Sequence, residues 1–110
     1  MPRHADALQA ASPAFVASTV AHLRAVAPPP RGTRVRVVRA DADPGEHGHC
    51  ATVDGKRFTI SIYLDLSEIA CELILIHEWA HVLSWHAPDD YGPEWGVVHA
   101  RIYCAFYAVT

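Results

Sequence analysis

The chain has 110 residues, of which 51% are hydrophobic and 19% are charged, and its formal net charge is -3. This length and composition predict a single globular domain with one core and exclude a disordered chain. The slightly acidic balance does not suggest a dedicated nucleic-acid binder, and no apolar run approaches the length of a membrane span.

The N-terminal segment and the cysteines bear on the cellular compartment. Residues 1–10 lack the basic stretch and the following apolar stretch of a signal peptide. The three cysteines, Cys50, Cys71 and Cys104, form an odd set without the spacing of a disulfide framework. Cys71 and Cys104 fall on apolar helical stretches, where we expect small buried side chains. We therefore expect a cytoplasmic protein that does not associate with membranes.

The first predicted element is a helix that runs from Pro13 to about Val26. Ser12 followed by proline is typical of an N-cap and a first helical residue, and the prolines at 28–30 end the helix. Three strands are predicted next, at residues 33–40, 50–53 and 57–64. The last two flank Asp54-Gly55, a strong hairpin signal.

The three strands are expected to form an antiparallel sheet. In the last of them, Phe58, Ile60 and Ile62 share one face, which predicts a half-buried strand. If this strand lies at an edge of the sheet, an extended peptide can pair with it by strand addition. Around the first strand, four arginines fall within nine residues. We interpret them as a solvated strand face, with a surface for phosphate or an acidic partner as the alternative.

The pattern HExxH, formed by His77, Glu78 and His81, lies in residues 67–85. That run has no Gly or Pro and carries apolar residues at helical spacing. Histidines at i and i+4 of a helix stand about 6 Å apart, so both imidazoles can reach one tetrahedral zinc ion. Glu78 is turned by roughly 100° about the helix axis, from where it can reach a water beside the metal. The pattern predicts His77 and His81 as zinc ligands and Glu78 as the general base.

After a turn, Gly92-Pro93-Glu94 predicts the start of a last helix that runs to about Ala108. The order of helix, three strands, helix and helix gives an α+β fold class. Residues 75–85 (LIHEWAHVLSW) and 91–103 (YGPEWGVVHARIY) together resemble the SprT-like (Spartan-type) zinc metallopeptidases, especially small phage and bacterial domains. In that family, HExxH is followed by a loop and by His-Gly-Pro-Glu-aromatic at the start of the next helix.

The resemblance covers about residues 75–107 and implies a minimal zincin fold. It implies His77 and His81 as ligands, Glu78 as the base, and hydrolysis of peptide bonds in protein or peptide substrates. Relatives of the Spartan type act on proteins attached to DNA, which adds association with DNA as an implied property. Two other hypotheses stay open: a zincin-fold binding module that has lost turnover, and an interaction domain without metal.

The third zinc ligand is where this sequence departs from the family pattern. The family has histidine immediately before Gly-Pro-Glu, and this chain has Tyr91. Zinc lowers the pKa of a bound phenol below its usual value of about 10, so we expect Tyr91 to bind through its phenolate oxygen. Alternative ligands are Asp90, His86, Glu94 and His99, and a site without a third ligand also stays open. The candidates for stabilising an oxyanion are Tyr91, His99 and Arg101.

Overall fold

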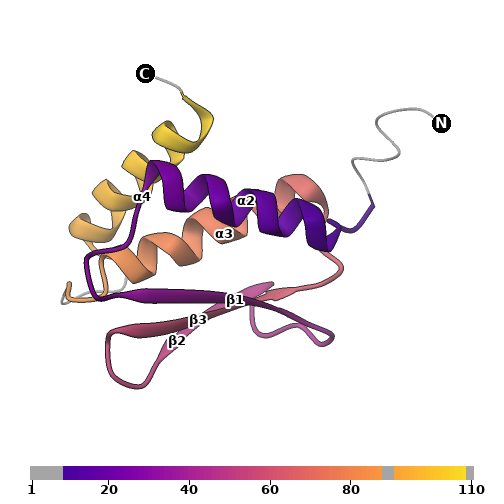
Figure 1. The fold of residues 1–110 in the computed structure, drawn as a ribbon, viewed down its shortest axis with the longest axis horizontal. Helices are drawn as coiled ribbons and strands as arrows, with labels where there is room; N and C mark the ends of the chain where they lie inside the picture. Colours follow the sequence, from indigo (N-terminus) through magenta and orange to yellow (C-terminus); the bar gives the residue numbers. More distant parts are fainter. Residues whose placement is uncertain (1–8, 88–90, 109–110) are drawn as a thin grey trace.

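A computed structural model describes residues 9–87 and 91–108 of the chain. Its elements are α2 (Pro13–Val26), β1 (Arg34–Ala40), β2 (Gly48–Thr52), β3 (Arg57–Tyr63), α3 (Glu68–Leu83) and α4 (Pro93–Tyr107). The predicted α+β class is confirmed, and the helices lie on one side of a three-stranded sheet (Figure 1). In the described part of the chain, no helix is both long and apolar enough to cross a bilayer.

The sheet is mixed, which corrects the prediction of an antiparallel sheet. Its strand order is β1-β3-β2, with β3 parallel to β1 and antiparallel to β2. The alternation of side chains along a strand records which face is buried, but it does not record the direction of a neighbouring strand. The chain therefore leaves β1, skips one strand position to form β2, and returns to fill the gap with β3. As a result β3 is central, and β2 rather than β3 is an edge strand.

The core lies between the sheet and the helices. Phe58, Ile60 and Ile62 of β3 are buried, as predicted, and β3 packs against α3. On α3, Trp79 is fully buried, and its indole Nε1 donates a hydrogen bond of 2.8 Å to the carbonyl of Ala27, just after α2. This bond and the surrounding packing fix the rotation of α3 about its own axis.

α2 starts where the sequence predicted, and a serine side chain caps the start of both α2 and α3. The Ser12 hydroxyl accepts a hydrogen bond from the Phe15 amide at 3.0 Å, and the Ser67 hydroxyl accepts one from the Ala70 amide at 3.2 Å. Each serine therefore satisfies one of the amides that a helix leaves unpaired in its first turn. Cys104, by contrast, is exposed and not buried as expected.

Side chains near β1 explain part of the arginine cluster. Arg39 donates hydrogen bonds to the carbonyls of Ala11 at 2.9 Å and Leu64 at 3.4 Å, so it ties the segment before α2 to the end of the sheet. Arg34 and Arg36 of β1 are exposed. The interpretation of a solvated strand face therefore holds for these two arginines.

Gly48 allows β2 to approach α3 closely. A Cβ atom added at this position would lie 2.5 Å from Cγ2 of Ile74 and 3.4 Å from Cγ of Glu78. Contacts this short are not tolerated without movement, and Ile74 is branched at Cβ and therefore stiff. The absence of a side chain at Gly48 thus sets the distance between the edge strand and the helix that carries HExxH.

Replacing Gly48 by alanine is expected to destabilise the protein by about 1–3 kcal/mol, the usual effect of overpacking. The double variant Gly48→Ala/Ile74→Ala should lose less stability than the sum of the two single variants, because the truncated side chain no longer collides with the new methyl group. Urea unfolding followed by circular dichroism measures these differences. Gly96→Ala on α4 is the control, since nothing lies within 4 Å of its added Cβ; strictly additive losses would contradict the proposed collision.

Candidate metal centre

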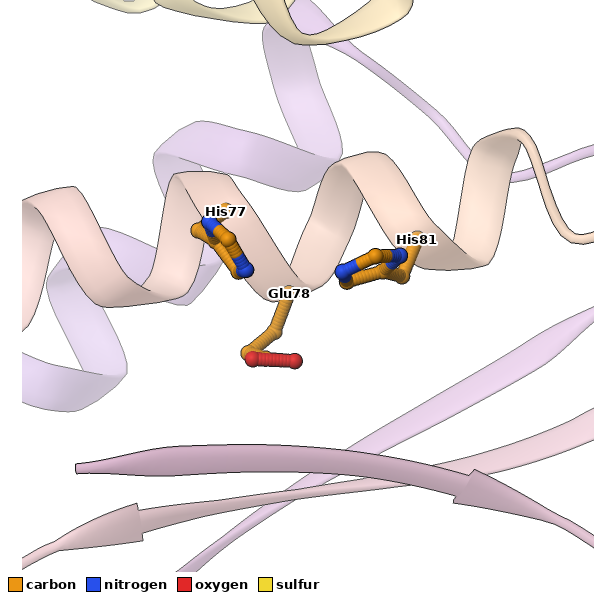
Figure 2. A group of neighbouring side chains, drawn as sticks. All are labelled: His77, Glu78 and His81. Carbon is orange, nitrogen blue, oxygen red and sulfur yellow. The ribbon is translucent and has the colours of Figure 1, made fainter. Parts of the chain in front are cut away.

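α3 brings the three functional residues of HExxH together. The potential ligand atoms of His77, Glu78 and His81 all lie within 4.8 Å of one another. The two imidazole rings are 5.0 Å apart and inclined at 73° to each other. Figure 2 shows the carboxylate of Glu78 extending away from the helix towards the strands. Two nitrogen donors and one carboxylate therefore converge on a single point beside α3.

The opposite side of the same helix is anchored in the core. Ile76, Trp79 and Ala80 are fully buried. These buried residues lie among His77, Glu78 and His81 in the sequence but on another side of the helix. Their burial therefore turns the three functional side chains towards the edge of the sheet. The orientation of the site is thus a consequence of the packing of these apolar side chains in the core.

A cleft of about 510 Å³ opens between α3 and the edge strand. One wall is formed by β2 and the loop before it, and the other by α3 with two aromatic residues that follow it. The lining residues are Gly45, Glu46, Gly48, His49, Cys50, Ile74, His77, Glu78, His81, Trp85 and Tyr91. The cleft is large enough for a segment of peptide and contains the predicted general base.

Glu78 has the protonation behaviour expected of a general base at neutral pH. Its side chain is buried, and this desolvation raises the pKa of Glu78 to about 7, with a further contribution from the negative charge of Glu46. Burial disfavours a charged carboxylate because water no longer solvates it. A base whose pKa lies near the working pH can both accept a proton and release it again.

His77 and His99 are biased towards their neutral form. Burial lowers the pKa of His77, and the nearby His99 acts in the same direction, whereas Glu46 opposes the shift. Burial also lowers the pKa of His99. Only a neutral imidazole has the free lone pair that a metal needs, so these shifts favour metal binding at neutral pH.

Tyr91 stands over the two histidines. Its hydroxyl lies 3.3 Å from Nε2 of His77, and its ring centroid lies 5.0 Å from that of His81. A tetrahedral zinc ion with bonds of about 2.0–2.1 Å holds its ligand atoms about 3.3 Å apart. The distance between the Tyr91 hydroxyl and Nε2 of His77 therefore matches the spacing of two ligand atoms in a zinc site.

The other candidate ligands are placed less favourably. His86 and Glu94 pair with each other, with Nε2 and Oε2 2.6 Å apart, and both side chains are exposed. His99 stacks on Trp95 with ring centroids 4.7 Å apart, and its own ring is 6.4 Å from that of His77. Asp90 lies outside the described residues. Among the described candidates, Tyr91 is the one whose oxygen meets a histidine nitrogen of the motif.

The three candidates for stabilising an oxyanion also differ in their distance from the cleft. Tyr91 lines the cleft, whereas Arg101 lines a different surface groove beside Pro28 and Leu83. His99 reaches the site through its contacts with Trp95 and His77. The structure therefore brings Tyr91 and His99 towards HExxH and places Arg101 in a separate groove.

Sequence reasoning missed the residues that β2 and the preceding loop bring to the cleft. Glu46 lies between the first two predicted strands, in a segment for which the sequence predicted no function. Cys50 carries a half-buried thiol whose pKa is raised to about 12 by burial and by the charge of Glu78. No local pattern identifies these residues, because their position depends on the strand order that makes β2 the neighbour of α3.

Comparison with known proteins identified no relative of this chain. No protein-family model, no curated protein and no solved structure matches the chain. The geometry of the cleft and the HExxH pattern are therefore the basis for assigning a function.

Proposed function

We propose that the protein is a zinc-dependent endopeptidase of the SprT-like kind, acting on protein or peptide substrates. The observation that carries this proposal is the convergence of His77, Glu78, His81 and the Tyr91 hydroxyl at one end of the cleft. His77 and His81 would hold zinc through imidazole nitrogens, and Tyr91 through its phenolate oxygen. Their donor types and spacing fit a tetrahedral zinc site with one position left for chemistry.

Glu78 is the proton-transfer group in this mechanism. A zinc ion in the site would supply Lewis-acid chemistry, polarising the substrate carbonyl and making water easier to deprotonate. Glu78 accepts a proton from the attacking water at its carboxylate and then gives it to the nitrogen of the leaving amine as the C–N bond breaks. Burial of this carboxylate raises its pKa, which makes it a better proton acceptor than an exposed glutamate.

β2 offers a backbone partner for an extended substrate. The Tyr63 amide donates to the His47 carbonyl at 3.0 Å, and the antiparallel register then directs the backbone groups of His49 and Ala51 towards β3. The backbone N–H and C=O groups of Cys50 point away from β3, to the side of β2 where no strand pairs with it in the described part of the chain. We assign the substrate backbone to this edge, by strand addition beside the cleft. This role replaces the one considered for β3, which is central.

Metal content tests the proposal directly. Protein prepared without chelators is expected to carry near one zinc ion per chain by mass spectrometry, and to cleave casein in a way that chelation stops and added zinc restores. Tyr91→Phe should weaken zinc affinity by at least about tenfold, the loss seen even for groups that only support a ligand. Tyr103→Phe, the same substitution on an exposed residue of α4, is the matched control.

Each result has a distinct meaning. Folded wild-type protein that binds no zinc would overturn the peptidase proposal and favour an interaction domain. Equal zinc affinity in Tyr91→Phe and wild type would remove Tyr91 from the ligand set and leave the two histidines in place. Bound zinc without any cleavage would favour the binding module that has lost turnover.

A further inference from the structure

The loop at residues 41–47, which leads into β2, is tightly organised around Asp43. Oδ1 of Asp43 accepts hydrogen bonds from the amides of Gly45 at 3.0 Å and His47 at 2.9 Å, and Oδ2 lies 3.0 Å from Nδ1 of His47. The His47 ring in turn stacks on Tyr63 of β3, with centroids 6.2 Å apart. The loop is therefore fastened both to itself and to the sheet.

This organisation holds Glu46 in an unusual backbone conformation. Glu46 and His47 have φ angles of 47° and 72°. This left-handed region is disfavoured for residues that carry a Cβ atom. Two successive residues of this kind persist only where their surroundings fix them, and such positions are concentrated at functional sites. Here the result is that Glu46 lines the cleft next to the HExxH residues.

The carboxylate of Glu46 gives this wall of the cleft a negative charge. Glu46 lines the same cleft as His77 and Glu78. Its charge partly opposes the lowering of the His77 pKa by burial, and it adds to the rise that burial causes in the pKa of Glu78. No lysine or arginine is present among the described residues that line the cleft. Within the described ranges, Glu46 also forms no ion pair with any basic side chain. The cleft thus presents an acidic group that has no lysine or arginine partner in the part of the chain that the structure describes.

We propose that Glu46 forms a subsite that selects substrates with an arginine or lysine side chain close to the scissile bond. This inference rests on the proposed endopeptidase function and names its substrate class. A guanidinium or ammonium group would pair with the carboxylate, and arginine would do so through two parallel hydrogen bonds. An acidic substrate side chain would instead meet the like charges of Glu46 and Glu78, so the same wall rejects it.

Peptide binding tests the subsite without requiring turnover. The Glu78→Gln variant removes the general base, so a peptide can be titrated by calorimetry without being cleaved. Two extended peptides are compared that differ at a single residue, which is arginine in one and citrulline in the other. Citrulline has nearly the same shape as arginine but no charge. The substituted residue is moved in turn to each position flanking the bond. At one position the arginine peptide should bind about tenfold more tightly, as expected for a charge-assisted hydrogen bond.

Substitutions of the loop identify the responsible group. Adding Glu46→Gln to Glu78→Gln should abolish the difference between the two peptides, and adding Glu46→Arg should reverse the preference towards a glutamate peptide. Adding Asp41→Asn, which neutralises an exposed carboxylate of the same loop outside the cleft, should leave the arginine preference unchanged.

The outcomes separate the subsite from the proposed function. Measurable but equal affinity for the arginine and citrulline peptides at every position would overturn the subsite and leave the peptidase proposal standing. Binding of neither peptide would overturn both. An arginine preference that depends on Glu46, found together with wild-type protein that cleaves nothing, would support the subsite and overturn the peptidase.

Discussion

Replacing Glu78 by glutamine is expected to reduce peptide-bond cleavage by a factor of about 10² to 10⁴, the usual contribution of a positioned general base. Glutamine has almost the same size as glutamate but cannot accept the proton of the attacking water. His77 and His81 are unchanged, so zinc content should remain that of the wild type. The measurement is the initial rate of casein cleavage together with the zinc content of the same preparation.

A second substitution on α3 provides the control for Glu78. Glu72→Gln is the same chemical change six residues earlier. Its amide oxygen can still accept the hydrogen bond that the Tyr107 hydroxyl donates to Glu72 at 3.0 Å. This variant should therefore keep the wild-type rate. If Glu72→Gln and Glu78→Gln lost equal activity, the loss would reflect a disturbed helix, and Glu78 would not be the base.

Replacing Trp79 by alanine is expected to lower the free energy of unfolding by about 3–5 kcal/mol. Trp79 is fully buried, and its indole bonds the carbonyl of Ala27 at 2.8 Å while the guanidinium of Arg24 lies 5.8 Å from the ring centroid. Small domains have a total stability of about 5–15 kcal/mol, so this single change removes a large part of it. Urea unfolding of metal-free protein, followed by far-ultraviolet circular dichroism, measures the loss.

Two further tryptophan variants separate packing from hydrogen bonding. Trp79→Phe keeps an aromatic ring but leaves the buried Ala27 carbonyl without its donor, which should cost about 1–3 kcal/mol. Trp85→Ala removes a 45% exposed side chain that makes an edge contact with Phe58, and it should cost at most about 1.5 kcal/mol. Equal losses for Trp79→Ala and Trp85→Ala would contradict the anchoring role of Trp79.

The features that the sequence predicted correctly depend on neighbouring residues. Ser12 caps α2 because its hydroxyl reaches an amide three residues away, and Gly92-Pro93 begins α4 because proline suits a first helical turn. The convergence of His77 and His81 is of the same kind, since a helix places residues four apart on one face. Such features can be predicted without knowledge of the rest of the chain.

The features that the sequence did not predict depend on distant pairings. The parallel contact of β1 with β3 joins strands that β2 separates in the chain, and no local pattern encodes it. The same strand order places Glu46 in the cleft, which is why that residue was missed. Cys104 was misjudged for a different reason: α4 packs through Ile102 and Phe106, and Cys104, between them in sequence, projects from the opposite side of the helix.

The bond from Trp79 to Ala27 also bears on the order of folding and metal uptake. In small zinc modules the ion itself brings distant ligands together, so losing the metal means losing the fold. Here Trp79 lies between His77 and His81 in sequence and is held by α2, so the core fixes both imidazoles independently of any ion. A helix held in this way is preorganised, so the proposed zinc ion would not need to spend its binding free energy on folding the chain. We therefore expect that the ion could be removed and replaced while the protein stays folded.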